Sequence, residues 1–105
     1  VMQTIGELSI IAVAIPVNTT ATVHIPALLR PLTGGASLVE AAGSTLRDVI
    51  ADVVRQQPAL AGRIADAHGI LPEIMIAIGD TEAMHVDAPV PDGAEVWVLP
   101  ALAGG

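Results

Sequence analysis

The stretch STLRDVIADVVRQ, residues 44–56, decides the fold, because it carries the clearest helical period in the chain. Its apolar residues recur three and four positions apart, at Leu46, Val49, Ile50 and Val53. Ser44 or Thr45 can cap the amino end, and Asp48 stands three residues after Thr45, as in a capping box. The polar residues fall toward other faces, so the apolar stripe must lie on a sheet.

Two strands are predicted before this helix. Residues 21–29 alternate in part and end at the Arg30-Pro31 break, and Pro26 marks the later half as an edge. Thr33-Gly34-Gly35 can supply the positive φ angles of a tight reversal, so residues 36–41 are expected to return as the second strand. Arg30 is interpreted either as a partner contact or as a surface charge that ends the strand.

Two further strands are predicted after the helix. Residues 58–68 read as a polar connection or a short helix, because proline and glycines interrupt any period. Residues 73–78 place three isoleucines on one face of a strand, and Met75 and Ala77 on the other. Pro91-Asp92-Gly93 then makes a turn that leads into the last strand.

The last predicted strand is apolar on both faces. Val96 and Val98 alternate with Trp97 and Leu99 until Pro100 ends the ladder. The predicted order is therefore β-β-α-β-β. This order is what an α+β, ubiquitin-like β-grasp fold requires, in which a mixed sheet packs on one main helix.

One helix can cover only one face of such a sheet, so the other face is informative. Met75, Ala77, Trp97 and Leu99 would form an exposed apolar patch of the kind that a partner buries. The connection 58–72 or the N-terminal segment could equally cover this face. The sequence leaves these alternatives open.

The composition bounds the class of protein. At 105 residues the chain is long enough for one hydrophobic core, and Trp97 is its only aromatic residue. The net charge is −7 and none of the four cations is lysine, which argues against nucleic acid as a partner and favours a basic partner surface. The absence of cysteine removes disulfides and thiolate zinc sites, and indicates the cytoplasm. Residues 8–17 are apolar but too few to span a bilayer, so no membrane partner is expected.

The ending of the chain resembles that of a known bacterial family. DGAEV at 92–96 opens the last strand, Pro100 follows it, and AGG at 103–105 ends the chain. This order is similar to the close of the sulfur carriers that include molybdopterin-synthase small subunits and thiamine-thiazole carriers. The segment TVHIPALLRPLTGG at 22–35 is most similar to the actinobacterial branch that serves a cysteine synthase.

The resemblance implies a division of the chain. Residues 21–105 would form a β-grasp sulfur-carrier domain with a flexible C-terminal tail at 100–105. Residues 1–20 would be an N-terminal extension. Val1 and Val17 fit translation from alternative valine start codons, so the extension is either a mis-assigned start or an extra edge strand.

Membership of this family would place the working group at the C-terminus. An E1-like adenylyltransferase would consume ATP to adenylate the carboxyl group of Gly105, and sulfur would then replace AMP to give a thiocarboxylate. Gly104 and Gly105 would form the sulfur-carrying terminus, while the chain would supply no catalytic side chain and hold no permanent cofactor. The surface expected to dock on partners comprises Met75, Trp97, Leu99, Pro100, Ala101, Leu102 and Ala103.

The resemblance also implies the partners. They are the E1-like adenylyltransferase and sulfurtransferase and a sulfur-accepting synthase. The sulfur is released either by the acceptor enzyme or by a dedicated metallohydrolase. Cysteine biosynthesis is the favoured destination, while molybdopterin, thiazole and thiolated natural products stay open.

Two other functions share parts of this pattern. A ubiquitin-like protein modifier has the same fold and activation but ends as an isopeptide on target lysines. An adaptor domain would use the Met75 and Trp97 face alone. His24, His68 and His85 lie on different predicted elements and repeat no metal spacing, so no metal site is expected.

Overall fold

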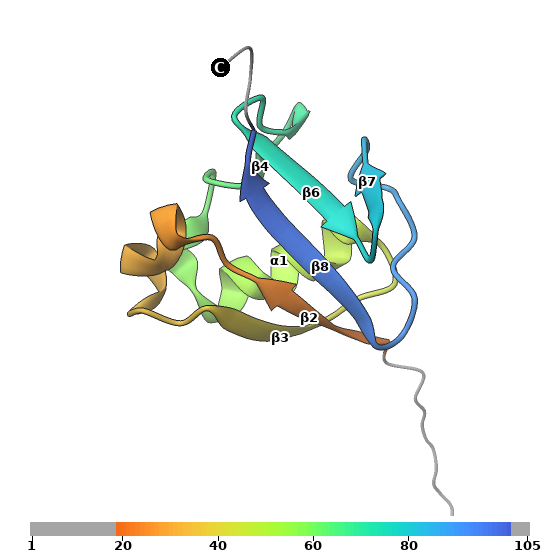
Figure 1. Ribbon diagram of the computed structural model, residues 1–105, viewed down its shortest axis with the longest axis horizontal. Helices are drawn as coiled ribbons and strands as arrows, with labels where there is room; N and C mark the ends of the chain where they lie inside the picture. The colour runs from red at the N-terminus through yellow and green to blue at the C-terminus, as the bar shows by residue number, and fades with distance from the viewer. Residues whose placement is uncertain (1–18, 102–105) are drawn as a thin grey trace, which may run out of the picture.

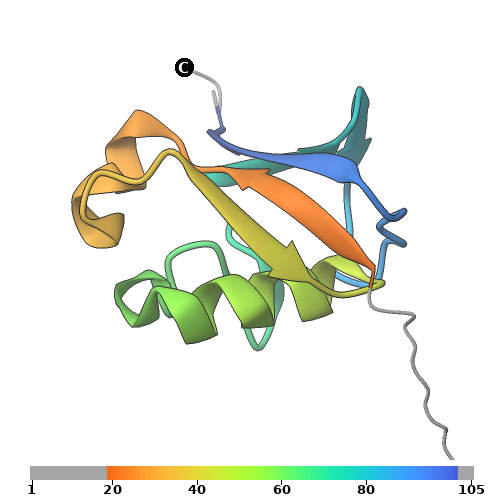
Figure 2. The same ribbon diagram turned by 90° about the horizontal axis from the view of Figure 1, so that it is seen from below.

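A parallel pair of strands lies at the centre of the sheet in the computed structural model, which describes residues 19–101 (Figure 1). These strands are β2 (Thr20–His24) and β8 (Ala94–Pro100). Antiparallel pairings add β3 (Leu38–Ala42), β6 (Ile74–Ile78) and β7 (Thr81–Ala83), which gives the order β3-β2-β8-β6-β7. The helix α1 (Leu46–Gln56) packs across one face (Figure 2), so the predicted α+β grasp fold is confirmed.

The helix α1 begins at the cap that the sequence predicts. The Thr45 hydroxyl accepts a hydrogen bond from the Asp48 N–H at 3.3 Å, and Asp48 adds a negative charge to the first turn. Leu46, Val49 and Val53 are almost completely buried. The predicted apolar stripe is therefore the face of α1 that packs on the sheet.

The core lies between α1 and the inner face of the sheet. The inward residues of β2, β3, β6 and β8 that form it are Ala21, Val23, Val39, Ala41, Ile74, Ile76, Val96 and Val98. Leu60 and Ile64 of the connection after α1 join the same cluster, and η3 (Pro58–Leu60) is the short helix that the sequence allowed. The connection thus packs on the helix side of the sheet (Figure 2) and, within residues 19–101, leaves the outer face uncovered.

The first strand is shorter than predicted, and the interpretation of Pro26 as an edge marker is wrong. β2 ends at His24 and lies inside the sheet, between β3 and β8. Pro26 instead precedes a 3-10 helix, η2 (Ala27–Thr33), and its carbonyl oxygen accepts the Leu29 N–H at 2.9 Å. Because proline has no N–H for the ladder, it ends the strand where the apolar pattern continues.

The reversal into β3 is confirmed at the predicted glycines. Gly34 and Gly35 have φ angles of 65° and 91°, in the region that glycine adopts without steric cost. The buried Thr33 braces this turn, since its hydroxyl lies 3.1 Å from the Arg30 carbonyl oxygen and 2.8 Å from that of Ala36. β3 then runs over Leu38–Ala42 in place of the predicted 36–41.

The sequence pattern did not predict two small sets of strands. β7 follows β6 through Gly79 and has only one buried residue, Ala83, so it shows no alternation. β4 (Ala65–Asp66) and β5 (Gly69–Ile70) form a ribbon of two residues on each side, too short for any period. Residues 1–18, which hold most of the predicted N-terminal extension, lie outside the described residues.

Candidate functional site

The chain leaves the sheet at the end of a central strand. Pro100 is the last residue of β8 and lies opposite Ile74 of β6. One more contact follows, because the Ala101 N–H donates to the Glu73 carbonyl oxygen at 2.8 Å. The C-terminal segment therefore starts from a hydrogen-bonded position beside β6 (Figure 1). Four predicted site residues lie outside the described residues: Leu102, Ala103, Gly104 and Gly105.

Apolar side chains gather on the outer face of the sheet, next to this exit. The register places Trp97 opposite Ala77 and Leu99 opposite Met75. Trp97 is 38% exposed, and Leu38 on β3, which is 55% exposed, widens the patch. The predicted gathering of four of these residues on one face is confirmed, whereas their docking role stays a prediction. We call Leu38, Met75, Ala77, Trp97 and Leu99 the outer patch.

His24 supports the outer patch, although the sequence did not single it out for docking. The parallel register places His24 opposite Trp97, and their rings stack with centroids 3.5 Å apart and planes 10° from parallel. His24 Nε2 also lies 2.6 Å from Glu95 Oε1. Two neighbours on β8 thus hold the imidazole. No local pattern could reveal this contact, because His24 and Glu95 are 71 positions apart in the sequence.

Carboxylates occupy the part of the outer face that lies farther from the tail exit. Glu95 lies two residues before Trp97 on the same side of β8. Glu40 on β3 accepts a hydrogen bond from the Thr22 hydroxyl at 2.6 Å. The outer face therefore carries its apolar residues near the exit, and carboxylates at its other end and, through Glu82 opposite Ala77, at the β7 edge.

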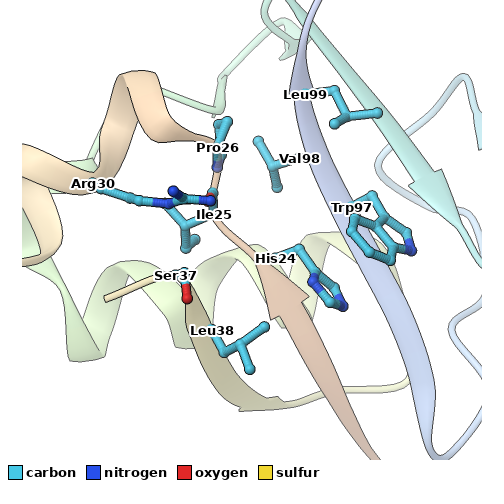
Figure 3. A pocket seen from close by; sticks show the side chains of 9 residues that line it. All are labelled: His24, Ile25, Pro26, Arg30, Ser37, Leu38, Trp97, Val98 and Leu99. Carbon is cyan, nitrogen blue, oxygen red and sulfur yellow. The ribbon is translucent and has the colours of Figure 1, made fainter. Parts of the chain in front are cut away.

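A groove lies between the outer patch and η2 (Figure 3). Its volume is about 280 Å³, and its lining residues are His24, Ile25, Pro26, Arg30, Ser37, Leu38, Trp97, Val98 and Leu99. Arg30 Nε donates to the Ile25 carbonyl oxygen at 3.0 Å, which holds this side chain against the groove wall. The sequence allowed Arg30 to be either a partner contact or a surface charge. Of the grooves described within residues 19–101, the one lined by Trp97 and Leu99 is also the one lined by Arg30.

Asp52 on α1 lies away from the outer patch. The backbone N–H of Ala42 donates to this carboxylate at 2.9 Å and the Arg55 guanidinium also donates to it, so the pKa of Asp52 lies below its ordinary value. The ionised group ties α1 to the end of β3. Its role is therefore to hold the scaffold that carries the site.

Residues 19–101 contain no group of three or more His, Asp or Glu side chains placed to hold one metal ion. The hydroxyl of Thr45 is engaged as the cap of α1. In the same part of the chain, no helix has the length and apolar character that crossing a membrane requires.

A mixed five-stranded sheet that packs one face on a single main helix is the arrangement of small ubiquitin-like β-grasp proteins. The chain belongs to the ThiS family, which it matches over residues 23–105. The resemblance inferred from the ending and from residues 22–35 is therefore confirmed at the level of the family.

Relatives and solved structures agree with this membership. "Sulfur carrier protein CysO" from Mycobacterium tuberculosis is 37% identical over 90 residues, which cover 80% of this chain and 97% of the relative. The crystal structure of the Amycolatopsis orientalis BexX/CysO complex matches with a TM-score of 0.74 and 34% identity, over 81% of this chain and 99% of that chain. The crystal structure of Mycobacterium tuberculosis CysO gives 0.72 and 32%, over 78% and 99%. Small archaeal modifier protein 1 from Methanosarcina acetivorans shares the fold, with a TM-score of 0.69 and 22% identity, over 84% and 98%.

Proposed function

We propose that this chain is a sulfur carrier whose working group is the C-terminal carboxylate of Gly105. The observation that carries the proposal is the order of the chain's last residues. β8 ends at Pro100 in a hydrogen-bonded exit, and AGG at 103–105 follows in a member of the ThiS family. The name of the 37% identical relative, a sulfur carrier protein, supports the same role.

The proposed chemistry takes place on the terminal carboxyl group. A carboxylate is a poor acyl donor, so an E1-like enzyme joins it to the AMP portion of ATP and releases pyrophosphate. A sulfur nucleophile then attacks the carbonyl carbon of Gly105, the bond to the AMP oxygen breaks, and a thiocarboxylate results. The chain acts as a substrate of this enzyme and supplies no catalytic side chain. Because the route consumes ATP, we propose the cytoplasm as its location.

The tail has the length and the residue types that this role needs. When extended, residues 100–105 span on the order of 20 Å, enough to enter a partner's active site while the sheet stays outside. Gly104 and Gly105 have no Cβ, so they fit a narrow channel and bend freely. Capture of an extended C-terminus is an established mode of protein recognition.

The outer patch supplies the proposed docking surface. Trp97, Leu99 and Met75 lie beside the exit at Pro100 and Ala101, so a partner that receives the tail would cover them at the same time. Exposed aromatic and apolar side chains of this kind contribute most of the affinity in many interfaces. The Amycolatopsis orientalis structure, in which CysO is in complex with BexX, supports docking of this fold on a partner protein.

The acceptor that we favour is a cysteine synthase. The segment at 22–35 resembles the carriers of that branch, and the relatives named CysO are similar over most of the chain. Release of the sulfur by the acceptor and release by a dedicated metallohydrolase both stay open. Molybdopterin, thiazole and natural-product thiolation use the same kind of terminus.

Intact mass spectrometry tests the proposal. The chain is incubated with ATP, a sulfide source and the E1-like enzyme from the same cell. We expect a mass gain equal to the difference between sulfur and oxygen, localised to Gly105, and no gain in a variant that lacks Gly105. An unchanged mass with a demonstrably active enzyme would contradict the proposal. Covalent adducts on target lysines would instead identify a protein modifier, and partner binding that survives removal of both glycines without loading would identify an adaptor.

A further inference from the structure

The four arginines of the chain divide into two kinds. Two pair with carboxylates on or beside α1, Arg47 with Asp87 and Arg55 with Asp52. Within residues 19–101, Arg30 and Arg63 have no carboxylate at salt-bridge distance. Arg30 lines the groove beside the outer patch, whereas Arg63 lines a separate groove with Leu28 and Leu32 of η2. The cation next to the outer patch is therefore Arg30.

Arg30 is held in place before any partner arrives. Its Nε donates to the Ile25 carbonyl oxygen at 3.0 Å, and its own carbonyl oxygen accepts the Gly35 N–H at 2.8 Å. The two Nη groups make no hydrogen bond to other residues of 19–101. A guanidinium fixed at Nε and open at both Nη groups presents a fork that fits a carboxylate, at little cost in side-chain entropy.

Apart from His24 and Ser37, the other lining residues of the groove are apolar, and Figure 3 shows Arg30 on the η2 side of it, with Trp97 and Leu99 on the β8 side. This surface complements an apolar side chain that has a carboxylate next to it. We propose that the enzyme that receives the tail inserts such a pair, an apolar residue beside an Asp or Glu, and that Arg30 binds the carboxylate. The proposal rests on the proposed carrier function and names how its partner recognises the chain.

The position of Arg30 favours a protein carboxylate over a nucleotide phosphate. Leu99 lines the groove, so Arg30 lies beside the start of the tail. The carboxyl group that ATP activates is at Gly105, about 13 Å beyond Ala101 when the tail is extended. The phosphates of the adenylate are therefore at the far end of the tail. The anion that meets Arg30 comes from the surface on which the domain docks.

The distribution of charge also gives the docking a direction. Arg30 lies at the exit end of the outer face, and Glu40 and Glu95 lie at the other end. A partner with a carboxylate at the mouth of its tail channel gains an ion pair in the productive orientation. In the reversed orientation the same carboxylate would face acidic side chains, and this like-charge contact disfavours the wrong docking.

The experiment measures adenylation of the full chain by the E1-like enzyme, as pyrophosphate release at varied carrier concentration. For Arg30→Ala we expect kcat/KM to fall about 10- to 100-fold through KM, the range for loss of a charge-assisted hydrogen bond. Arg30→Lys keeps the charge without the fork and should recover only part of the loss. Arg63→Ala is the matched control and should behave as the wild type.

A second pair of variants leaves Arg30 in place. Ser37→Glu puts a carboxylate into the same groove. This carboxylate would pair with the Arg30 guanidinium in place of the partner's carboxylate, so the variant should reproduce the rise in KM. Ser37→Gln, of similar size and neutral, should not. Circular dichroism and thermal unfolding check that each variant folds.

The outcomes separate this inference from the carrier function on which it rests. If the wild-type chain is loaded with sulfur but Arg30→Ala matches Arg63→Ala, or Ser37→Glu matches Ser37→Gln, the inference is overturned and the carrier function stands. If the wild-type chain is not loaded at all, both are overturned. Higher salt should raise KM more for the wild type than for Arg30→Ala, because salt screens the ion pair that Arg30 makes with the partner.

Discussion

His24 and Trp97 stack across the parallel pair β2 and β8, with ring centroids 3.5 Å apart. Glu95, two residues before Trp97 on β8, also contacts the imidazole, because its Oε1 lies 2.6 Å from His24 Nε2. The indole is thus fixed on one side by its neighbours while 38% of the residue stays exposed. A large aromatic side chain that is already held in position loses little entropy on binding, which makes Trp97 the best anchor for a partner.

Trp97→Ala should therefore affect docking more than folding. We expect KM for the carrier to rise at least about 10-fold, as for a typical hot-spot residue. The free energy of unfolding should change by only about 1 kcal/mol, because the side chain is partly exposed. Steady-state adenylation and urea unfolding measure the two effects.

Met84→Ala provides the matched control for Trp97. Met84 is also large and apolar, and 69% exposed, but it follows β7 and lies outside the outer patch. This variant should leave KM unchanged. An equal rise in KM for both variants would show that general surface hydrophobicity, not the outer patch, drives the association.

Adjacent residues on β6 should separate function from stability. Ile76 is fully buried on the inner face, and Met75 lies opposite Leu99 on the outer patch. Ile76→Ala should cost about 2–5 kcal/mol of unfolding free energy. Met75→Ala should cost far less and should raise KM for the carrier. If Met75→Ala destabilises the fold as much as Ile76→Ala, the two faces of the sheet are not distinct in the way the register indicates.

The sequence predicted those features that depend on neighbours in the chain. The helix with its Thr45 cap, the reversal at Gly34 and Gly35, and the alternation of β6 and β8 all follow from local period and backbone chemistry. The same alternation placed Met75 and Leu99 on one face, and the structure adds that they lie opposite each other. The site residues at the C-terminus came from the family resemblance instead, and the last four, residues 102–105, lie outside the described residues.

What the sequence missed depends on contacts between distant segments. The stack of His24 on Trp97 exists only because β2 and β8 pair in parallel with a particular register. The groove needs η2, which appeared as the end of a strand because its leucines continue the apolar pattern past Pro26. A short 3-10 helix with an internal proline has no period long enough to recognise.

Thr45→Ala tests which of two adjacent residues caps α1. The Thr45 hydroxyl accepts the Asp48 N–H, so its removal should cost about 1 kcal/mol of unfolding free energy. The structure records no hydrogen bond of the Ser44 side chain within residues 19–101, so Ser44→Ala should be nearly neutral. Urea unfolding of both variants measures the difference. The reverse order of effects would move the cap by one residue.

Asp52→Asn should destabilise the fold in a way that depends on pH. The Ala42 N–H and Arg55 hold the folded-state pKa of Asp52 below its ordinary value of 3.8. The ionised carboxylate therefore stabilises the fold above that value, and this contribution is lost as pH falls through the folded pKa. We expect Asp52→Asn to unfold at lower urea than the wild type at neutral pH, and the gap to close in strong acid. Urea titrations at the two conditions measure it.

Asp87→Asn is the control for this pH effect. Asp87 pairs with Arg47 at 3.0 Å, but their side chains are 75% and 61% exposed, and such surface pairs contribute little. Its unfolding midpoint should follow that of the wild type at both conditions. A gap between Asp52→Asn and the wild type that stays constant with pH would mean that the hydrogen-bond geometry at Ala42, and not the charge of Asp52, joins α1 to β3.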